Sequence, residues 1–270
     1  MPEEQPRTPP PSPERPPSPS ERAPSAATAL ETLRRTPVAQ LTQMPPAMTR
    51  ALGALREDFE RFDLEYRSAL VQVETRLETL QDEFALAHDH NPIEHIVTRV
   101  KSPESILRKA ADRGLSLDLD AMRRTVTDIA GARVILSFTE DVYRVFRHFT
   151  SQPDIRLVEV EDYIASPKPS GYRSLHCLVE VPVHFSTGTR HVTVEMQFRT
   201  IAMDFWASLE HKINYKFQGD VPADIATELV AAARVAADLD CRMEHLHRQV
   251  AEGPGDAGQP AGGTASGASA

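Results

Sequence analysis

Hydrophobic residues recur at steps of three and four along residues 49–86, a stretch that contains no proline. The recurring positions are Leu52, Leu55, Phe59, Phe62, Tyr66, Leu70, Val73, Leu77, Leu80 and Phe84. Such spacing places one side chain per turn on a common face, so it predicts a long amphipathic helix. Its length suits packing both on the rest of the domain and on a partner subunit.

Downstream of this helix, apolar strand-like runs alternate with helical patterns. Strands are predicted at 94–101, 131–138, 155–165, 174–185 and 190–200, and helices at 102–114, 139–151, 201–217 and 221–250. Ser102 and Thr139 are residue types favoured at a helix N-cap, and Pro103 suits the first helical position. A short STGT turn joins the last two strands into a hairpin. This order predicts an α/β (α+β) fold, a mixed β-sheet flanked by helices with a long helix at each end.

Composition divides the chain into three parts. Of 22 prolines, 13 lie within the first 46 residues, and proline fixes φ and removes a backbone donor. Residues 1–45 are therefore predicted to be a disordered Pro-rich arm, and the Gly/Ala-rich residues 251–270 a disordered tail. Residues 46–250 remain as one domain, long enough to bury a core in which Phe205 and Trp206 are expected.

Charge and cysteine content narrow the function classes. The formal net charge of −9 argues against general binding to a nucleic-acid backbone, which needs a broad basic surface. The two cysteines, Cys177 and Cys241, lack metal-ligand spacing, as expected of a reduced protein. No apolar run has the length of a membrane helix, and the N-terminus has no signal-peptide pattern. The protein is expected to be cytoplasmic.

Two carboxylates accompany apolar strands. Asp128 precedes the strand predicted at 131–138, and Glu195 lies within the strand predicted at 190–200. Carboxylates from neighbouring strands are ligands that Mg²⁺ accepts when it also holds phosphate oxygens. The alternative, on spacing alone, is an ordinary turn aspartate and a solvated strand glutamate.

Cationic residues gather around one predicted helix start. Arg99 and Lys101 lie two apart and so share a face of a strand, and Ser105 and free helical amides stand close by. A helix N-terminus favours phosphate. Arg108 and Lys109 are adjacent, so the two are not both expected in a site. The alternative is a solvated basic face.

The stretch YIASPKPSGYRSLH, residues 163–176, combines a turn with chemically capable side chains. Tyr172 offers a ring that can stack on a nucleobase, and Lys168 a charge that can neutralise phosphate. Gly171 permits a sharp turn or a close approach, and His176 can orient a phosphate or move a proton. The alternative is an aromatic residue packed at a sheet edge beside a structural histidine.

The stretch EMQFRT alternates polar and apolar residues. Glu195, Gln197 and Arg199 share one face of the predicted strand, and Met196 and Phe198 share the other. The apolar face is expected to meet the core. The polar face, which carries both signs of charge, either lines a pocket or faces water.

Four stretches of the chain, in order, resemble the synthetase domain of the RelA/SpoT family, and most of all its small, single-domain alarmone synthetases. They are TRVKSPESILRK, TDIAGARVILSF, DYIASPKPSGYRSLH and VEMQFRTIAMDFWASLEHKINYK, spread over roughly residues 94–217. The resemblance implies a nucleotidyltransferase-like fold. It also implies transfer of the β,γ-pyrophosphate of ATP to the ribose 3′-hydroxyl of GTP or GDP, which yields (p)ppGpp and AMP.

The resemblance assigns roles to individual residues. Asp128 and Glu195 match the catalytic pair that holds Mg²⁺, and Glu195 matches the residue that holds the metal or acts as base on the 3′-hydroxyl. The ATP-binding positions are Arg99, Lys101, Ser105, Lys109 and Arg133. The GTP/GDP-binding positions are Tyr172, Lys168, His176, Gln197 and Asp204. Among these, Tyr172 matches the residue that stacks on guanine and Lys168 the one that meets the acceptor's phosphates.

Two positions depart from the family pattern. Asp204 stands where close relatives have an asparagine that contacts guanine, and Glu161 stands where relatives often carry a basic residue. A carboxylate at 204 can still accept hydrogen bonds from the N1–H and exocyclic amine of guanine. Glu161 leaves the preference among GTP, GDP and GMP open.

The resemblance further implies a homotetramer built through the helices at 49–86 and 222–250, with (p)ppGpp as an allosteric ligand. The HDH at 88–90 ends a long helix and is not expected to form the hydrolase site of the family's longer members, so synthesis alone is expected. Two alternatives stay open. One is a module of the same fold that binds nucleotide or RNA without turnover, and the other is an unrelated nucleotidyltransferase that releases pyrophosphate instead of AMP.

Overall fold

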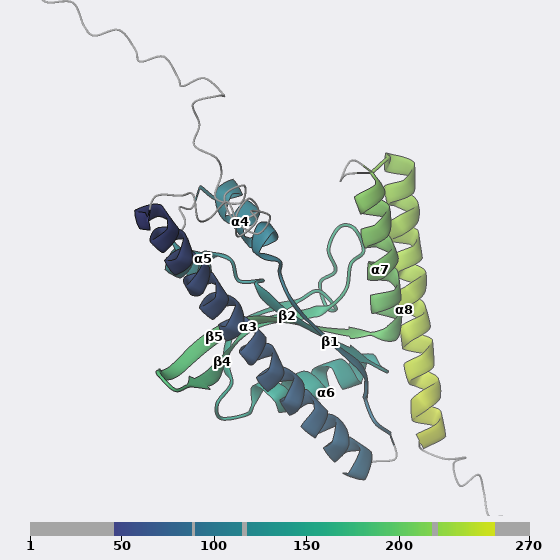
Figure 1. Cartoon of the computed structure of the whole chain (residues 1–270). Helices are drawn as coiled ribbons and strands as arrows, with labels where there is room; N and C mark the ends of the chain where they lie inside the picture. Colours follow the sequence, from purple (N-terminus) through teal and green to yellow (C-terminus); the bar gives the residue numbers. More distant parts are fainter. Residues whose placement is uncertain (1–45, 88–89, 115–117, 218–220, 252–270) are drawn as a thin grey trace, which may run out of the picture.

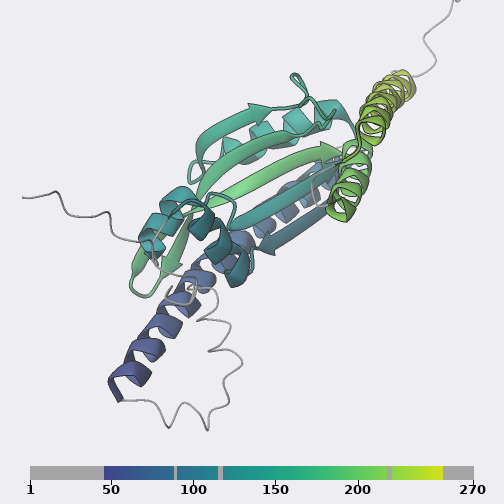
Figure 2. The same cartoon turned by 90° about the horizontal axis from the view of Figure 1, so that it is seen from above.

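The computed structural model describes residues 46–87, 90–114, 118–217 and 221–251. The Pro-rich arm predicted at 1–45 lies outside these residues, as do residues 88–89 and residues 252–270 of the predicted tail. The described residues form one β-sheet with helices packed around it (Figures 1 and 2).

The centre of the fold is a five-stranded sheet with the order β1-β2-β5-β4-β3 across the described residues. Its strands are β1 (Ile93–Val100), β2 (Ala130–Leu136), β3 (Arg156–Asp162), β4 (Leu175–Phe185) and β5 (Gly188–Thr200). β2 and β5 run parallel, whereas the other neighbouring strands run antiparallel. The predicted mixed sheet and its hairpin are confirmed, with strand limits that differ by a few residues.

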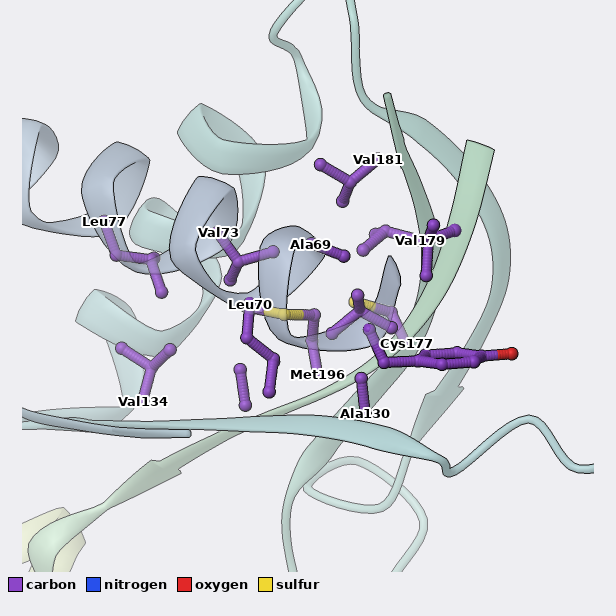
Figure 3. Packing of buried hydrophobic residues seen from close by; sticks show 14 of the residues in the cluster. Ala69, Leu70, Val73, Leu77, Ala130, Val134, Cys177, Val179, Val181 and Met196 are labelled. Carbon is purple, nitrogen blue, oxygen red and sulfur yellow. The ribbon is translucent and has the colours of Figure 1, made fainter. Parts of the chain in front are cut away.

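One face of the sheet carries the hydrophobic core beneath α3 (Pro46–Ala87) and α6 (Thr139–Thr150). Met196 and Phe198 of β5 are fully buried on this face, as the alternation in their strand predicted. Figure 3 shows Leu70 and Val73 of α3 packed over residues from three strands, among them Met196. Burial of this face fixes which side of every strand points away from α3.

The long helix α3 confirms the first periodic pattern. Its buried positions include Phe59, Phe62, Tyr66, Leu70, Val73, Leu77, Leu80 and Phe84, all of them predicted. Leu52 and Leu55 lie in the helix, but their side chains are outside those described. The amphipathic stripe is therefore the seam that attaches α3 to the sheet.

Among the described residues, helices flank the opposite face of the sheet only at its two ends (Figures 1 and 2). α4 (Pro103–Asp112) follows the end of β1, and α7 (Ile201–Lys216) follows the end of β5. Because β1 is antiparallel to β2, and β2 is parallel to β5, β1 and β5 run in opposite directions, so their C-terminal ends lie at opposite ends of the sheet along the strand direction. The face between the two helices is called the open face below.

The N-termini of the helices agree only in part with expectation. Ser102 caps α4, where its side chain accepts a hydrogen bond from the amide of Ser105. Thr139 does not cap α6, so that prediction is wrong. Phe138 holds the cap position without a side-chain bond, and Glu244 Oε1 accepts from the amide of Glu140 at 3.1 Å. A carboxylate from a distant helix thus replaces the local cap.

A further helix, α5 (Leu119–Thr125), was not predicted. Seven residues span too few turns to show a hydrophobic period. The local signal is Asp118, whose side chain accepts from the amides of Asp120 and Ala121. An Asp alone does not identify the start of a short helix in the sequence, because Asp is also common in turns.

Helix α8 (Ala223–Ala251) packs along α7 and is fixed to the sheet by polar contacts. Thr200, where β5 ends, donates to Asp240 Oδ2 at 2.6 Å, and Trp206 Nε1 donates to the carbonyl of Leu229 at 3.0 Å. Trp206 is buried as expected. Phe205 is 67% exposed, so its assignment to the core is wrong, because only one side of α7 meets α8 and the sheet.

The outer strand β3 lies exposed along almost its whole length. Leu157, Val158 and Val160 all remain partly in solvent, and Val158 and Val160 alternate with Glu159 and Glu161. No helix within the described part of the chain is long and apolar enough to cross a membrane.

Candidate active site

Most of the predicted site residues meet on the open face. Gly131 lies opposite Glu195 and Arg133 opposite Gln197 in the parallel pairing of β2 with β5. In the antiparallel pairing of β4 with β5, His176 also lies opposite Gln197. Directly paired residues point to the same side of a sheet. The three strands therefore present Arg133, His176, Glu195 and Gln197 together, each half-buried.

At the β1 end of the open face, two lysines hold Asp128. The Nζ atoms of Lys101 and Lys109 lie 2.6 and 2.7 Å from Asp128 Oδ2. Lys101 follows β1 and Lys109 lies on α4, so the turn into that helix brings the two cations to one carboxylate. These three residues are called the lysine group below. Arg108 is exposed, as expected if only its neighbour Lys109 faces the site.

Arg99 and Ser105 lie beside the lysine group. The Cγ and Nε atoms of Arg99 come within 3.9 Å of the point where a Cβ at Gly131 would stand. Ser105 exchanges hydrogen bonds with the capping Ser102 through both its amide and its hydroxyl. The structure thus brings the predicted ATP-binding residues to one edge of the open face, with the exception of Arg133.

The carboxylate of Asp128 is suited to a cation. Burial alone favours its protonated form, but the hydrogen bonds from Lys101 and Lys109 outweigh burial and lower the pKa of Asp128. Its second oxygen, Oδ1, is buried and has no hydrogen-bond partner among the residues that the structure describes. An ionised carboxylate with one unused buried oxygen is what a hard cation can bind.

Glu195 offers the second carboxylate. Its Oε2 accepts one hydrogen bond, from Gln197 Nε2 at 3.3 Å. Within the described ranges, no three His, Cys, Asp or Glu side chains form a metal-binding group. Mg²⁺ commonly uses one or two carboxylates and completes its shell with water and substrate phosphates. The donor set of Asp128 and Glu195 therefore fits Mg²⁺ bound together with a nucleotide.

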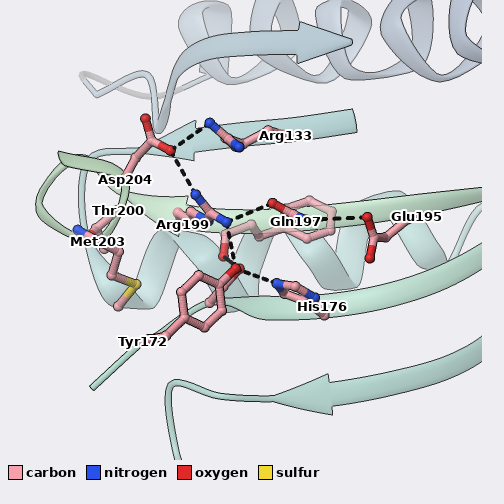
Figure 4. Close-up of polar contacts among 11 residues, drawn as sticks. Arg133, Tyr172, His176, Glu195, Gln197, Arg199, Thr200, Met203 and Asp204 are labelled. Atoms are coloured by element: carbon pink, nitrogen blue, oxygen red, sulfur yellow. Dashed lines mark hydrogen bonds and ion pairs between the residues drawn. The ribbon is translucent and has the colours of Figure 1, made fainter. Parts of the chain in front are cut away.

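At the β5 end of the open face, Asp204 lies between two guanidinium groups (Figure 4). Its Oδ1 is 3.0 Å from Arg199 and 3.1 Å from Arg133. These three residues are called the arginine group below. Predicted to bind ATP, Arg133 pairs here with a residue predicted to bind the acceptor. The Nε atoms of both arginines are buried and have no hydrogen-bond partner among the described residues.

Arg199 continues the network toward the middle of the face (Figure 4). Its second terminal nitrogen donates to the Tyr172 hydroxyl at 2.5 Å and to Gln197 Oε1 at 2.8 Å. The Tyr172 hydroxyl lies 2.6 Å from His176 Nε2. Because the phenol oxygen already accepts from Arg199, its own proton is free to go to Nε2. That places the proton of a neutral His176 on Nδ1.

His176 is held in its neutral form. Burial, together with the nearby positive charges of Arg199 and Lys168, lowers the pKa of His176 to about 4. At neutral pH the ring is therefore an acceptor at Nε2 and carries no charge of its own.

The β3–β4 loop, residues 163–174, folds Lys168 between two aromatic rings. Lys168 Nζ lies 4.1 Å from the ring centre of Tyr163 and 5.5 Å from that of Tyr172. Such cation–π contacts orient an ammonium group without neutralising it. Glu161, which lies opposite His176 in the β3–β4 pairing, faces the same side and adds a negative charge there.

Sequence reasoning missed part of this site. Arg199 had no assigned role, although it continues the alternation of Glu195 and Gln197 along β5. Tyr163 was not singled out, because its contact with Lys168 arises only when the loop folds back on itself. The pairing of Arg133 with Asp204 depends on the β2–β5 register, which spacing along the chain does not reveal.

The arrangement is suited to handling two anionic ligands. The lysine group and the arginine group lie at opposite ends of the open face, and Glu195 lies on the strand pair that connects them. In each group, two cationic side chains contact one carboxylate. An incoming phosphate can replace that carboxylate as their partner. A carboxylate placed between two such ligands can accept a proton from one of them.

Comparisons with known proteins agree with this picture. A family model described as the region found in RelA/SpoT proteins matches residues 98–220. The GTP pyrophosphokinase YwaC of Bacillus subtilis (strain 168) is 45% identical over 199 residues, which cover 74% of this chain and 95% of YwaC. This chain therefore belongs to the RelA/SpoT family.

Solved structures show which members of the family this chain is similar to. The structure of small alarmone synthetase 1 from Bacillus subtilis bound to its product pppGpp matches with a TM-score of 0.66 at 37% identity, over 72% of this chain and 98% of that one. The same synthetase bound to AMPCPP matches with a TM-score of 0.61 at 33% identity, over 73% and 99% of the two chains. The similarity thus extends over nearly the whole length of a small alarmone synthetase, as the sequence motifs predicted.

The neutral state of His176 can be tested by titration. The imidazole signal of His176, assigned by comparison with His176→Asn, should titrate with a midpoint near 4 in an NMR pH series. The unfolded chain binds a proton on this ring near pH 6.5, whereas the folded protein does so only near pH 4. The free energy of unfolding should therefore fall as pH drops from 6.5 toward 4, and His176→Asn should lose that component. A midpoint near 6.5 would contradict the buried, cation-surrounded ring.

Proposed function

We propose that this protein is a GTP pyrophosphokinase that makes (p)ppGpp. In this reaction the 3′-oxygen of GTP or GDP forms a bond to the β-phosphorus of ATP. The bond between that phosphorus and the oxygen bridging to the α-phosphate breaks, and AMP leaves with the bridging oxygen. The observation that carries the proposal is the position of Glu195, on the strand pair between the lysine group and the arginine group.

The comparisons supply independent support. YwaC is named a GTP pyrophosphokinase, and the similar small alarmone synthetase 1 has been solved with pppGpp and with AMPCPP. These ligands are a guanosine product and an analogue of ATP, the two nucleotide classes that the open face is suited to hold. The similarity extends over nearly the full length of these relatives, so it includes both ends of the open face.

The lysine group, with Arg99, is proposed to hold ATP. Lys101 and Lys109 both contact the same oxygen of Asp128, so two positive charges share one negative partner. Phosphate oxygens of ATP can replace Asp128 as the partner of these ammonium groups. Asp128 and Glu195 would hold Mg²⁺, which supplies charge neutralisation for the transferred group. Pyrophosphoryl transfer depends more on such neutralisation and positioning than on covalent help.

The β3–β4 loop and the arginine group are proposed to hold the acceptor. Tyr172 is proposed to stack on guanine and Lys168 to meet the acceptor's phosphates. Gln197 links Arg199 to Glu195, so it ties the orientation of the acceptor subsite to the carboxylate that receives the 3′-hydroxyl proton. Holding two nucleotides in fixed geometry converts a bimolecular step into an effectively unimolecular one.

The main alternative is a regulator of the same fold that binds nucleotide or RNA without turnover. The presence of both carboxylates and both cationic groups favours the enzyme. A transferase that releases pyrophosphate is distinguished by its by-product. Regulation by (p)ppGpp at an allosteric site remains a prediction from the resemblance.

The catalytic role of Glu195 is tested by product analysis. Purified protein incubated with Mg²⁺, ATP and GTP should give AMP and pppGpp, separated by anion exchange. Glu195→Gln should lower turnover about 10²- to 10⁴-fold, the usual contribution of a general base. The matched control is Glu180→Gln, the same change on β4, where Glu180 pairs with Arg156. Binding of both nucleotides without turnover, and without turnover when GDP or GMP replaces GTP, would favour the regulator. Release of pyrophosphate instead of AMP would favour an unrelated nucleotidyltransferase.

Asp204 is predicted to contribute to acceptor use. Asp204→Ala should raise the KM for GTP about tenfold or more, because a hydrogen bond to a charged group contributes about 1.5–3 kcal/mol. The KM for ATP should change much less. Asp204→Asn keeps the shape of the side chain and removes the charge shared with Arg133 and Arg199. It therefore separates the hydrogen bonding to guanine from the ion pairing with the two arginines. An unchanged KM for GTP in Asp204→Ala would contradict the assignment.

Self-association is proposed to use the outer face of α8. Val235, Leu239, Met243, Leu246 and Val250 are exposed and recur at steps of three and four. This spacing is typical of a seam between helices, and a second copy of the chain presents the same seam. The assembly is expected to be a tetramer, as the resemblance implies.

The seam is tested by light scattering after gel filtration. The unmodified protein should elute as a homo-oligomer, and Leu239→Glu together with Leu246→Glu should reduce it to a smaller species. Arg234→Glu, which introduces the same side chain on a different exposed side of the same helix, is the control. A monomer in the unmodified protein would contradict the proposal.

A further inference from the structure

The β3–β4 loop contacts α8 at Gly171, where the two backbones come so close that no larger side chain fits. A Cβ added to Gly171 would lie 2.5 Å from the Cβ of Ala233, 3.7 Å from the Cα of Val230 and 3.9 Å from a ring carbon of Trp206. Gly171 also has φ = +89°, a conformation that side chains strongly disfavour. Glycine is therefore required here twice, once for the turn and once for the contact with α8.

The contact belongs to a small apolar cluster separate from the main core. Its buried members are Trp206, Ala207 and Ala233, and Tyr172 of the loop packs against them. The hydrogen bond from Trp206 to the carbonyl of Leu229 fixes the indole to α8. The cluster thus joins the loop, α7 and α8 at one place.

Two backbone hydrogen bonds within the loop connect this cluster to the open face. The amide of Gly171 donates to the carbonyl of Lys168 at 2.8 Å, and the amide of Lys168 donates to the carbonyl of Tyr172 at 3.1 Å. These bonds link the residue that touches α8 to the two residues proposed to hold the acceptor. A displacement of Gly171 therefore displaces Lys168 and Tyr172 as well.

The position of α8 is itself fixed relative to β5. The bond between Thr200 and Asp240 connects α8 to the end of the strand that carries Glu195 and Gln197. The same helix thus contacts both the loop and the strand, and it sets the distance between them.

We propose that Ala233 is a positioning residue for the acceptor nucleotide, acting through Gly171. The side of α8 that faces the loop forms a seat for Gly171, which only a small side chain at 233 permits. This seat holds Tyr172 and Lys168 in the position that acceptor binding requires. The proposal rests on the proposed function, since it assigns the β3–β4 loop to the acceptor. Ala233 touches no substrate, so its effect should appear in acceptor use and not in ATP use.

The first test separates the KM values of the two substrates. Ala233→Val should raise the KM for GTP about tenfold, because small displacements of substrate-positioning groups have effects of this order or larger. The KM for ATP should stay within about twofold of the unmodified protein. Ala231→Val is the matched control, because Ala231 is exposed on the same helix and the change has the same cost in helix propensity. Equal KM values for GTP in the two variants would overturn the proposal.

The second test uses the steric contact directly. Gly171→Ala should raise the KM for GTP through both the clash with Ala233 and the unfavourable φ. Adding Ala233→Gly removes the methyl group that the new side chain meets, so the double variant should recover part of the loss. Simple additivity of the two effects would show that the contact carries no coupling and would overturn the proposal.

Hydrogen exchange distinguishes a failure of this proposal from a failure of the proposed function. In the full-length protein without nucleotide, Ala233→Val should speed exchange in peptides that cover residues 163–173, and Ala231→Val should not. If the unmodified protein makes no pppGpp, the proposed function fails, and with it the assignment to the acceptor, although faster exchange would still establish the seat. Faster exchange with an unchanged KM for GTP would overturn the positioning role alone.

Discussion

The parallel pairing of β2 with β5 is the constraint on which the rest of the structure depends. It sets Gly131 opposite Glu195 and Arg133 opposite Gln197, and it is buried on its other side against α3 and α6. Because side chains alternate along a strand, a slip of one residue would turn Met196 and Phe198 toward the open face and Glu195 into the core. The energy of burying the apolar face thus also fixes the position of every polar group on the open face.

The cationic groups on the open face explain how an acidic protein handles polyphosphates. Lys101 and Lys109 share Asp128, and Arg133 and Arg199 share Asp204, so each pair of cations is partly neutralised before a ligand arrives. Two like charges held close together would repel each other without that carboxylate. A phosphate that binds takes over a role already filled in the free protein, so the site needs little rearrangement to accept it.

Sequence reasoning predicted the parts of the structure that depend on local pattern. The period of α3, the Ser102 cap and the alternation along β5 each express a preference of neighbouring residues, and the structure agrees with all three. The errors share another origin. Glu244 replaces Thr139 as the acceptor at the start of α6, and Phe205 is exposed because only one side of α7 is covered. Both outcomes depend on contacts between residues far apart in the chain, which no local pattern contains.

The exposed strand β3 has a consequence for the behaviour of the protein in solution. An outer strand with free backbone groups and exposed apolar side chains is a template for pairing with another copy, and charged residues are a common protection against it. Glu159 and Glu161 alternate with the exposed Val158 and Val160, so like-charge repulsion opposes edge-to-edge association of two such strands. Glu161 also faces the open side of the sheet, beside His176. A change of charge at this position therefore alters both the repulsion between two such outer strands and the electrostatic surroundings of His176.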